Sequence, residues 1–378
     1  MEKFKQILEH IKEVGLRVDW DVLKRNHKTL SDESESLRSL IEQKTGISNP
    51  NSSQQCAEYF HIKLQVPIIK EGSSGKISMD AEVLSKLAED YPVASDITSY
   101  RSKQKGVSLI ESLLKQDGGN RGRIRPEYSI GSTGRVFFKN PNVTGFSEFV
   151  REAVIPDEGK VFVYLDFASA ELGIAATLAG ESKLMDEIIW GEDFHSANAE
   201  LLGCSRREAK TFIFALLYGA SKTTLMEKTG LGEFDVDSYL TAFHRKYPRL
   251  IEYFQSLSKE IKEQGYSESW RGRKMQLEGG NHGLLKCINH VIQGTCSDIM
   301  EEISVILSDA MKPVGGVVKM IVFDAILLEV NEGMSGNAAN IIEDNASHLG
   351  DFRFRVVVDE GENWRVASGK GEKNGSNG

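Results

Sequence analysis

Two apolar β-type segments, residues 317–322 and 326–330, are separated by only three residues. Apolar segments of this length standing so close together predict a buried β-hairpin. The turn of this hairpin carries an acid, Asp324. A carboxylate at the end of a buried strand can be held rigidly while it faces an open cleft, so we expect a functional site at this turn.

A second carboxylate, Asp166, follows a third apolar β-type segment, residues 161–165. Two carboxylates brought together repel each other unless cations bridge them. Mg²⁺ binds a few carboxylates together with substrate phosphates and water, so two Asp residues suffice for a two-metal phosphoryl-transfer site. Taken singly, each Asp is also typical of a turn or a helix cap, and the pattern alone leaves that alternative open.

A predicted helix at residues 206–219 presents two different faces. At about 100° per residue, its cations and aromatic rings fall within a stripe about 120° wide, while Phe212 and Ile213 belong to a separate apolar face. The stripe consists of Arg206, Arg207, Lys210, Phe214 and Tyr218. Cations suit phosphates and aromatic rings suit a base or sugar, so the stripe predicts a nucleoside triphosphate site. A surface helix with snorkelling cations is the alternative.

The formal net charge of −9 argues at first against a nucleic-acid partner. Phosphate contacts, however, need only a local basic surface. Residues 101–139 hold nine Lys or Arg and three Asp or Glu, a local excess of +6. Within this stretch Arg121, Arg123 and Arg125 stand among glycines and predict a flexible basic loop.

The sequence also argues against several other classes of protein. The four cysteines include no CxxC pair and no zinc-type cluster. There is no run of 18 apolar residues and no apolar signal core, so we expect a soluble, cytoplasmic protein without a membrane partner. Further helices are predicted at residues 4–14, 20–44, 81–87, 181–262 with a break near 230–232, and 284–311.

Taken in order, these segments resemble the three polymerase motifs of the family A, or bacterial polymerase I-like, DNA polymerases. Asp166 with Glu171 five residues later is similar to motif A. Motif C of that family is usually His-Asp-Glu, and here it reads Phe323-Asp324-Ala325. Motif B is matched at Arg206, Lys210, Phe214, Tyr218 and Gly219.

Other segments resemble elements of the same family, again in the same order. They are Thr133-Gly134-Arg135, Pro141-Asn142, Asp193-Phe194-His195, Asn289, Gln293-Gly294-Thr295 and Gly361-Glu362-Asn363-Trp364. The likeness covers roughly residues 10 to 367, and residues 15–23 and 78–91 are similar to the family's thumb. Because the likeness begins near the N-terminus, we expect no proofreading or 5′-nuclease domain.

The resemblance implies an α+β fold of the right-hand polymerase type, with a thumb, a palm built on an antiparallel sheet, and helical fingers. The implied divisions are a mostly helical thumb at 1–127, a palm at 128–178 and 286–367, fingers at 179–285, and a disordered tail at 368–378. Asp166 and Asp324 both fall in the implied palm.

The resemblance also implies roles for individual residues. Asp166 and Asp324, with the Phe167 carbonyl, would bind two Mg²⁺ ions, or Mn²⁺ in their place, and Lys210 would donate a proton to the leaving group. The incoming deoxynucleotide would be contacted by Arg206, Lys210, Phe214, Tyr218 and His195, with Glu171 excluding a ribose 2′-hydroxyl. The primer-template would be contacted by Arg135, Asn142, Arg207, Asn289 and Gln293.

The predicted function is template-directed addition of deoxynucleotides to a 3′-hydroxyl. Departures from the family on the primer side, at Phe323, Gly173 and Leu285, favour an alternative: a primase-like enzyme of a mobile element or phage that starts on single-stranded template. A small accessory protein, a helicase or a single-strand-binding protein is a candidate partner. A third hypothesis is a catalytically silent DNA-binding subunit. The presence of two acids together with a cationic stripe argues against it, because a silent subunit would not require both.

Overall fold

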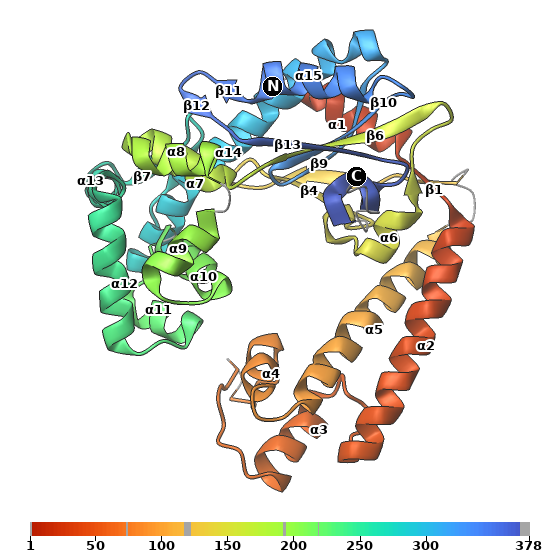
Figure 1. The fold of residues 1–378 in the computed structure, drawn as a ribbon, viewed down its shortest axis with the longest axis vertical. Helices are drawn as coiled ribbons and strands as arrows, with labels where there is room; N and C mark the ends of the chain where they lie inside the picture. The colour runs from red at the N-terminus through yellow and green to blue at the C-terminus, as the bar shows by residue number, and fades with distance from the viewer. Residues whose placement is uncertain (1, 73–74, 117–121, 192–193, 218, 371–378) are drawn as a thin grey trace, which may run out of the picture. The chain divides into compact units, whose positions relative to one another are not determined.

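The computed structural model describes residues 2–72, 75–116, 122–191, 194–217 and 219–370 (Figure 1). The chain forms two compact units. One comprises residues 17–124 and 146–155, and the other comprises residues 1–16, 125–145 and 156–378. The thumb, palm and fingers boundaries inferred from the resemblance stay predictions. None of the helices within the described ranges is both long and apolar enough to cross a membrane.

The smaller unit is built on two long helices that pack against each other, α2 (Trp20–Thr45) and α5 (Val93–Gln116) (Figure 1). Helix α2 begins where the Asp19 side chain accepts hydrogen bonds from two backbone N–H groups of the first turn, and it ends at Gly46, whose φ is 83°. The rest of the unit consists of α3 (Ser53–Ala57), η1 (Glu58–Lys63), α4 (Ala81–Leu87), α6 (Glu148–Ala153) and a three-stranded sheet of β2 (Arg123–Ile124), β1 (Leu16–Val18) and β5 (Val154–Ile155).

The larger unit contains a four-stranded antiparallel sheet in the order β13-β6-β10-β9. Its strands are β6 (Lys160–Phe167), β9 (Val317–Val322), β10 (Ala325–Asn331) and β13 (Val356–Gly361). The predicted hairpin is confirmed as β9 and β10, and the predicted strand before Asp166 is β6. Ala325 pairs with Val322, so the turn is two residues long and Ala325 already belongs to β10.

Helices cover this sheet and extend away from it. The longest is α14 (Gly280–Ala310), which is buried along most of its length and contacts α1 (Glu2–Val14), α7 (Ala170–Ala179) and α15 (Ser335–Ala346). The other helices are α8 (Ser182–Trp190), α9 (Phe194–Leu202), α10 (Arg206–Leu217), α11 (Lys222–Thr229), α12 (Glu233–Lys246), α13 (Pro248–Gln264), η2 (Val143–Gly145), η3 (Lys312–Val314) and η4 (Val366–Lys370). Small hairpins are formed by β3 (Glu127–Ile130) with β4 (Val136–Lys139), β7 (Tyr266–Glu268) with β8 (Lys274–Gln276), and β11 (His348–Leu349) with β12 (Phe352–Arg353). The combination confirms the α+β class.

Two expectations from the sequence need correction. The predicted helical block at 181–262 has more breaks than the one near 230–232, because Gly203 adopts φ 65° after α9 and Pro248 starts a new helix. The predicted basic loop is partly ordered: Arg123 lies in β2, and the Arg125 side chain donates a hydrogen bond to the Glu13 carbonyl oxygen at 2.9 Å. Arg121 lies outside the described residues, as do residues 371–378 of the predicted tail.

The largest fully buried side chain of the described chain is Trp364, which lies shortly after the end of β13 at Gly361 and has no exposed surface. We expect Trp364→Ala to lower the free energy of unfolding by about 3–5 kcal/mol, because it removes a large apolar side chain and leaves a cavity. Trp190→Ala is the matched control, because the Trp190 side chain is 79% exposed and its loss should change the same quantity by no more than about 0.5 kcal/mol. Urea unfolding of both variants checks this, and equal losses would contradict it.

Candidate active site

The two predicted acids lie on neighbouring strands. Asp166 is directly opposite Ala325 in the β6–β10 register, and the Phe167 N–H donates to the Asp324 carbonyl oxygen at 3.3 Å. Because Asp324 precedes Ala325, the two acids are offset by one residue along the paired strands. Neighbouring strands are about 4.8 Å apart, so the two acids lie close together. The Asp166 side chain is exposed between the buried Leu165 and Phe167, and Asp324 is half-buried.

Unusual backbone conformations occur close in sequence to several predicted site residues. Of the described non-glycine residues, four have a positive φ, and three of them are Asn140 (55°), Ser169 (55°) and Phe323 (57°). Each stands within three residues of a predicted site residue. A left-handed conformation costs a non-glycine residue roughly 1–2 kcal/mol, and such strain concentrates at functional sites. Sequence reasoning gave no sign of it.

A buried ion pair lies beside the acids. The Arg135 guanidinium donates to the Glu171 carboxylate, and the Glu171 side chain is almost fully buried. Burial raises the pKa of Glu171, Arg135 lowers it, and the nearby Asp324 charge raises it again. The resemblance implies a primer-template role for Arg135 and a nucleotide-sugar role for Glu171, but it gives no indication that the two side chains contact each other.

Helix α10 brings one of its cations, Lys210, near Asp324. Burial raises the pKa of Asp324, whereas the Asp324 backbone N–H and the charges of Arg135 and Lys210 lower it. Lys210 is therefore close enough to Asp324 to act on it electrostatically. Its ammonium nitrogen is 5.9 Å from the centroid of the Phe214 ring.

The two faces of α10 are those expected from the helical period. Its three cations, Arg206, Arg207 and Lys210, are exposed, while Phe212 and Ile213 are buried. The predicted His195 is buried on α9, and its ring centroid lies 5.8 Å from that of Phe214. Tyr218 and Asp193 lie outside the described residues.

The remaining predicted DNA-contacting residues come from two places. Asn142 is exposed just before η2, where its side-chain oxygen accepts a hydrogen bond from the Thr144 hydroxyl at 2.6 Å. Asn289 and Gln293 are half-buried, four residues apart on α14, and so share one face of that helix. Within the described chain, the buried Asn289 Oδ1 has no hydrogen-bond partner. A buried amide in this state favours a ligand that would satisfy it.

The donor set fits hard divalent cations. No group of three or more His, Cys, Asp or Glu side chains in the described chain could hold a metal by itself. Two carboxylates from adjoining strand ends, completed by a main-chain carbonyl such as that of Phe167, water and substrate oxygens, match the ligands that Mg²⁺ and Mn²⁺ prefer. The nearby Cys296 thiol is buried in α14, and burial raises its pKa, so it is poorly suited to act as a soft thiolate ligand.

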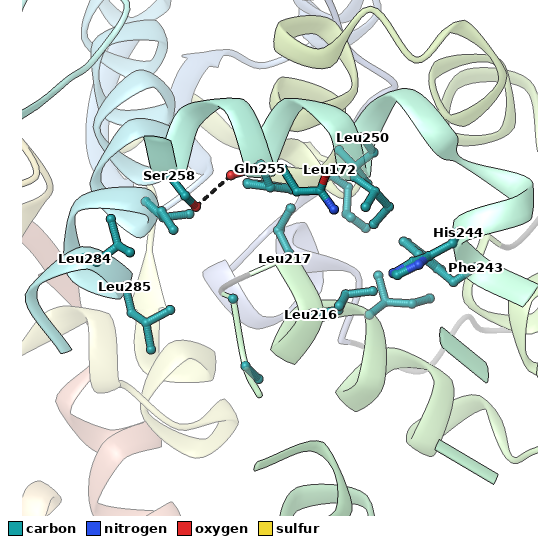
Figure 2. A pocket seen from close by; sticks show the side chains of 16 residues that line it. Leu172, Leu216, Leu217, Phe243, His244, Leu250, Gln255, Ser258, Leu284 and Leu285 are labelled. Carbon is teal, nitrogen blue, oxygen red and sulfur yellow. Dashed lines mark hydrogen bonds between the residues drawn. The ribbon is translucent and has the colours of Figure 1, made fainter. Parts of the chain in front are cut away.

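A separate apolar cavity of about 320 Å³ lies on the buried side of α10 (Figure 2). Figure 2 shows Leu216 and Leu217 of α10 facing Leu250 and Gln255 of α13 across it, with Leu285 of α14 at one end. None of the side chains lining it is an acid, so it is not a phosphoryl-transfer site. Gly219 lines the same cavity, and two features favour glycine at this position. Its φ is 72°, and a Cβ atom there would stand 2.7 Å from Leu285 Cδ2.

The fold is that of a polymerase domain. A solved structure described as the POL domain of Pol1 from M. smegmatis in complex with DNA primer-template and dNTP superposes with a TM-score of 0.87, at 21% identity, over 97% of this chain and 70% of that one. The model of the family described as DNA polymerase family A matches residues 20–366. The chain therefore belongs to DNA polymerase family A.

Curated relatives agree with this assignment. The chain is 27% identical over 393 residues to DNA polymerase I of Pseudomonas aeruginosa, covering 96% of this chain and 43% of that protein. It is 25% identical over 391 residues to the thermostable DNA polymerase I of Thermus aquaticus, covering 96% and 47%. The chain thus spans less than half the length of these relatives.

Proposed function

We propose that this chain catalyses template-directed DNA synthesis, adding deoxynucleotides to a 3′-hydroxyl at a site that holds two divalent metal ions. The observation that carries the proposal is the meeting of three groups: Asp166 and Asp324 on adjoining strands, and Lys210 of α10 within electrostatic range of Asp324. Family membership supports the same reaction.

Asp166 and Asp324, with the Phe167 carbonyl, would hold the two ions. Bound there, Mg²⁺ ions supply Lewis-acid chemistry, which favours an ionised 3′-hydroxyl and offsets charge on the phosphates. Burial raises the pKa of Asp324, whereas the positive charges of Arg135 and Lys210 lower it, so cations near this carboxylate favour its charged form. Mn²⁺ has the same ligand preferences and is expected to substitute.

The chain's own residues bind and orient the nucleotide. Arg206 and Lys210 are exposed on one face of α10 and would bind the phosphates, and Lys210 would give a proton to the leaving pyrophosphate. Phe214, whose ring lies near both Lys210 and His195, would pack against the incoming nucleotide. Tyr218 has the same proposed role. Primer-template contacts are proposed for Arg135, Asn142, Arg207, Asn289 and Gln293.

Glu171 is proposed to exclude the ribose 2′-hydroxyl. We expect Glu171→Ala to raise the ratio of ribonucleotide to deoxynucleotide kcat/KM by about tenfold or more, because truncation opens space that a buried side chain now fills. Glu171→Gln is the matched control, because it keeps the size of the side chain and should keep most of the discrimination against ribonucleotides. Single-nucleotide incorporation with both nucleotide types measures the ratio, and an unchanged ratio in Glu171→Ala would refute this role.

The proposed function is tested with a primed template of known sequence, Mg²⁺ and deoxynucleotides, omitting one deoxynucleotide at a time. We expect each product to stop where the template calls for the missing nucleotide, and all extension to cease when a chelator removes Mg²⁺. Products that ignore the template, or no extension at all, would overturn the proposal. An unprimed single-stranded template in the same experiment tests the primase-like alternative, which requires short products there.

A further inference from the structure

We propose that Arg273 is a positioning residue: its guanidinium fixes the β3–β4 turn and so places Arg135 near Asp324. Arg273 stands one residue before β8, and the sequence patterns gave it no role. The inference rests on the proposed function and deepens it, because Arg135 is proposed to contact the primer-template. Three observations carry it: the weak support of the β3–β4 hairpin, the packing of Arg273 on Gly134, and the anchoring of Arg273 by α14.

The β3–β4 hairpin has little support of its own. It is a two-stranded sheet that is not joined to the four-stranded sheet. An isolated two-stranded hairpin is at best marginally stable, and two apolar side chains of this one, Ile130 and Phe137, are 43% and 45% exposed. Arg135 lines a small cavity together with Ser297 and Met300 of α14, so the turn lies against that helix. What holds the turn there decides where Arg135 lies.

Arg273 packs directly on the backbone of this turn. Gly134 is buried and has φ 81°. A Cβ atom at Gly134 would stand 2.7 Å from Arg273 Cζ and 2.8 Å from both Nε and Nη2. These nearly equal distances indicate that the flat face of the guanidinium covers the Gly134 Cα. Only a residue without a Cβ atom permits so close an approach.

Helix α14 anchors the guanidinium from the other direction. Arg273 Nη2 lies 3.3 Å from Asp298 Oδ1 and 3.8 Å from Glu301 Oε2, and both acids are buried. The Asp298 carboxylate also accepts hydrogen bonds from the Ser269 hydroxyl at 2.5 Å and from the Arg271 backbone N–H at 3.0 Å. A buried carboxylate with several donors is held rigidly. Arg273 therefore presses the turn against a fixed point of the fold.

Arg135 is thus fixed at two places. Its backbone directly follows Gly134, and its guanidinium donates to the buried Glu171 carboxylate. From this position its positive charge lowers the pKa of Asp324. A shift of the turn would move the Arg135 guanidinium away from both acids, although Arg273 itself touches neither of them in any contact described above. Arg273 would therefore act on the reaction through Arg135.

The alternative is that Arg273 only neutralises the two buried acids of α14. A lysine could supply that charge, but it has no flat guanidinium to cover Gly134. In addition, Arg273 Nε is buried and has no hydrogen-bond partner within the described chain. A buried donor without a partner lowers stability, so stability alone does not account for an arginine here.

The test introduces Arg273→Lys into the wild type and into Arg135→Ala and measures kcat/KM for extension of a primed template. Arg273→Lys keeps the positive charge beside Asp298 and Glu301. In the wild type it should lower kcat/KM about tenfold, and in the Arg135→Ala background no more than about twofold, because residues that act through one another are coupled. Arg245→Lys, at an exposed position of α12, is the matched control and should change nothing.

A second variant approaches the same contact from the turn. Gly134→Ala places a methyl group against the guanidinium and should also lower kcat/KM about tenfold, with the same coupling to Arg135→Ala. Gly159→Ala is its matched control. Gly159 has φ 70° and nothing within 4 Å of an added Cβ atom, so this variant carries the backbone strain without the collision. It should leave kcat/KM near the wild-type value.

A purely structural role would make the losses multiply, so an equal fold-loss from Arg273→Lys in both backgrounds would overturn the inference. Wild-type kcat/KM in Arg273→Lys would do the same, as would equal effects of Gly134→Ala and Gly159→Ala. If Arg135→Ala extends the primer as well as the wild type does, Arg273 has nothing to position and the inference also fails. Absence of extension by the wild type would instead refute the proposed function.

Discussion

Asp324→Asn is expected to lower the rate of primer extension by about 10³-fold or more. Asn has nearly the shape of Asp but no charge, so it binds a divalent cation poorly, and several kcal/mol of charge stabilisation in the transition state are lost. Each tenfold in rate corresponds to about 1.4 kcal/mol. Single-turnover extension of a primed template measures the effect.

The same substitution should leave the fold intact. Burial raises the pKa of Asp324, so the folded protein without metal holds a proton there more tightly than the unfolded chain does. The free energy of unfolding that this carboxyl group contributes is therefore lost as the pH rises from its unfolded-state pKa through its folded-state pKa. At neutral pH, the Asp324→Asn variant should have a free energy of unfolding at least as large as that of the wild type. Asp344→Asn, on the exposed surface of α15, is the matched control with full activity. Equal extension by Asp324→Asn and wild type would refute the two-metal proposal.

Lys210→Met is expected to lower kcat by about 10²- to 10⁴-fold, the range that a positioned general acid contributes. Lys210 is exposed on α10, within electrostatic range of Asp324 and beside the Phe214 ring, so its removal takes away both a phosphate ligand and a proton donor. Affinity for the primer-template should change little. Pre-steady-state incorporation of one nucleotide separates the rate from nucleotide binding.

Lys210→Arg separates charge from proton transfer. Arg keeps the positive charge, but its pKa is too high for it to release a proton readily. We expect nucleotide binding by Lys210→Arg to lie near the wild-type value while kcat stays low. Lys183→Met, an exposed lysine of α8, is the control. Full activity of Lys210→Arg would show that Lys210 provides only a positive charge. Full activity of Lys210→Met would refute any role of Lys210 in the reaction.

Local patterns in the sequence were sufficient to predict the strands and the helix face that carry the candidate site residues. Apolar segments ending at Asp166 and at Asp324 predicted two strand ends with an acid each, and the register now puts these strands side by side. The helical period likewise separated the exposed cations of α10 from its buried face. The first inference depends on short continuous apolar segments and the second on the helical period, and a sequence displays both directly.

Contacts between distant residues could not be predicted in this way. Arg135 and Glu171 are 36 residues apart, and no local pattern pairs them. The approach of Arg135 to Phe323 depends on how the β3–β4 hairpin meets the sheet, which is decided by tertiary packing. Strand β13 was missed because only the first half of its sequence, VVVDEG, is apolar, so its segment lacks the longer continuous apolar character of β6 and β10.

The division of the smaller unit into residues 17–124 and 146–155 has a consequence for biosynthesis. Its three-stranded sheet needs β5, which is translated some thirty residues after β2. On a ribosome this unit cannot reach its complete structure until Ile155 has left the exit tunnel. Any truncation ending near residue 124 would therefore leave strand β1 without its β5 partner, whereas a fragment ending beyond Ile155 retains both segments.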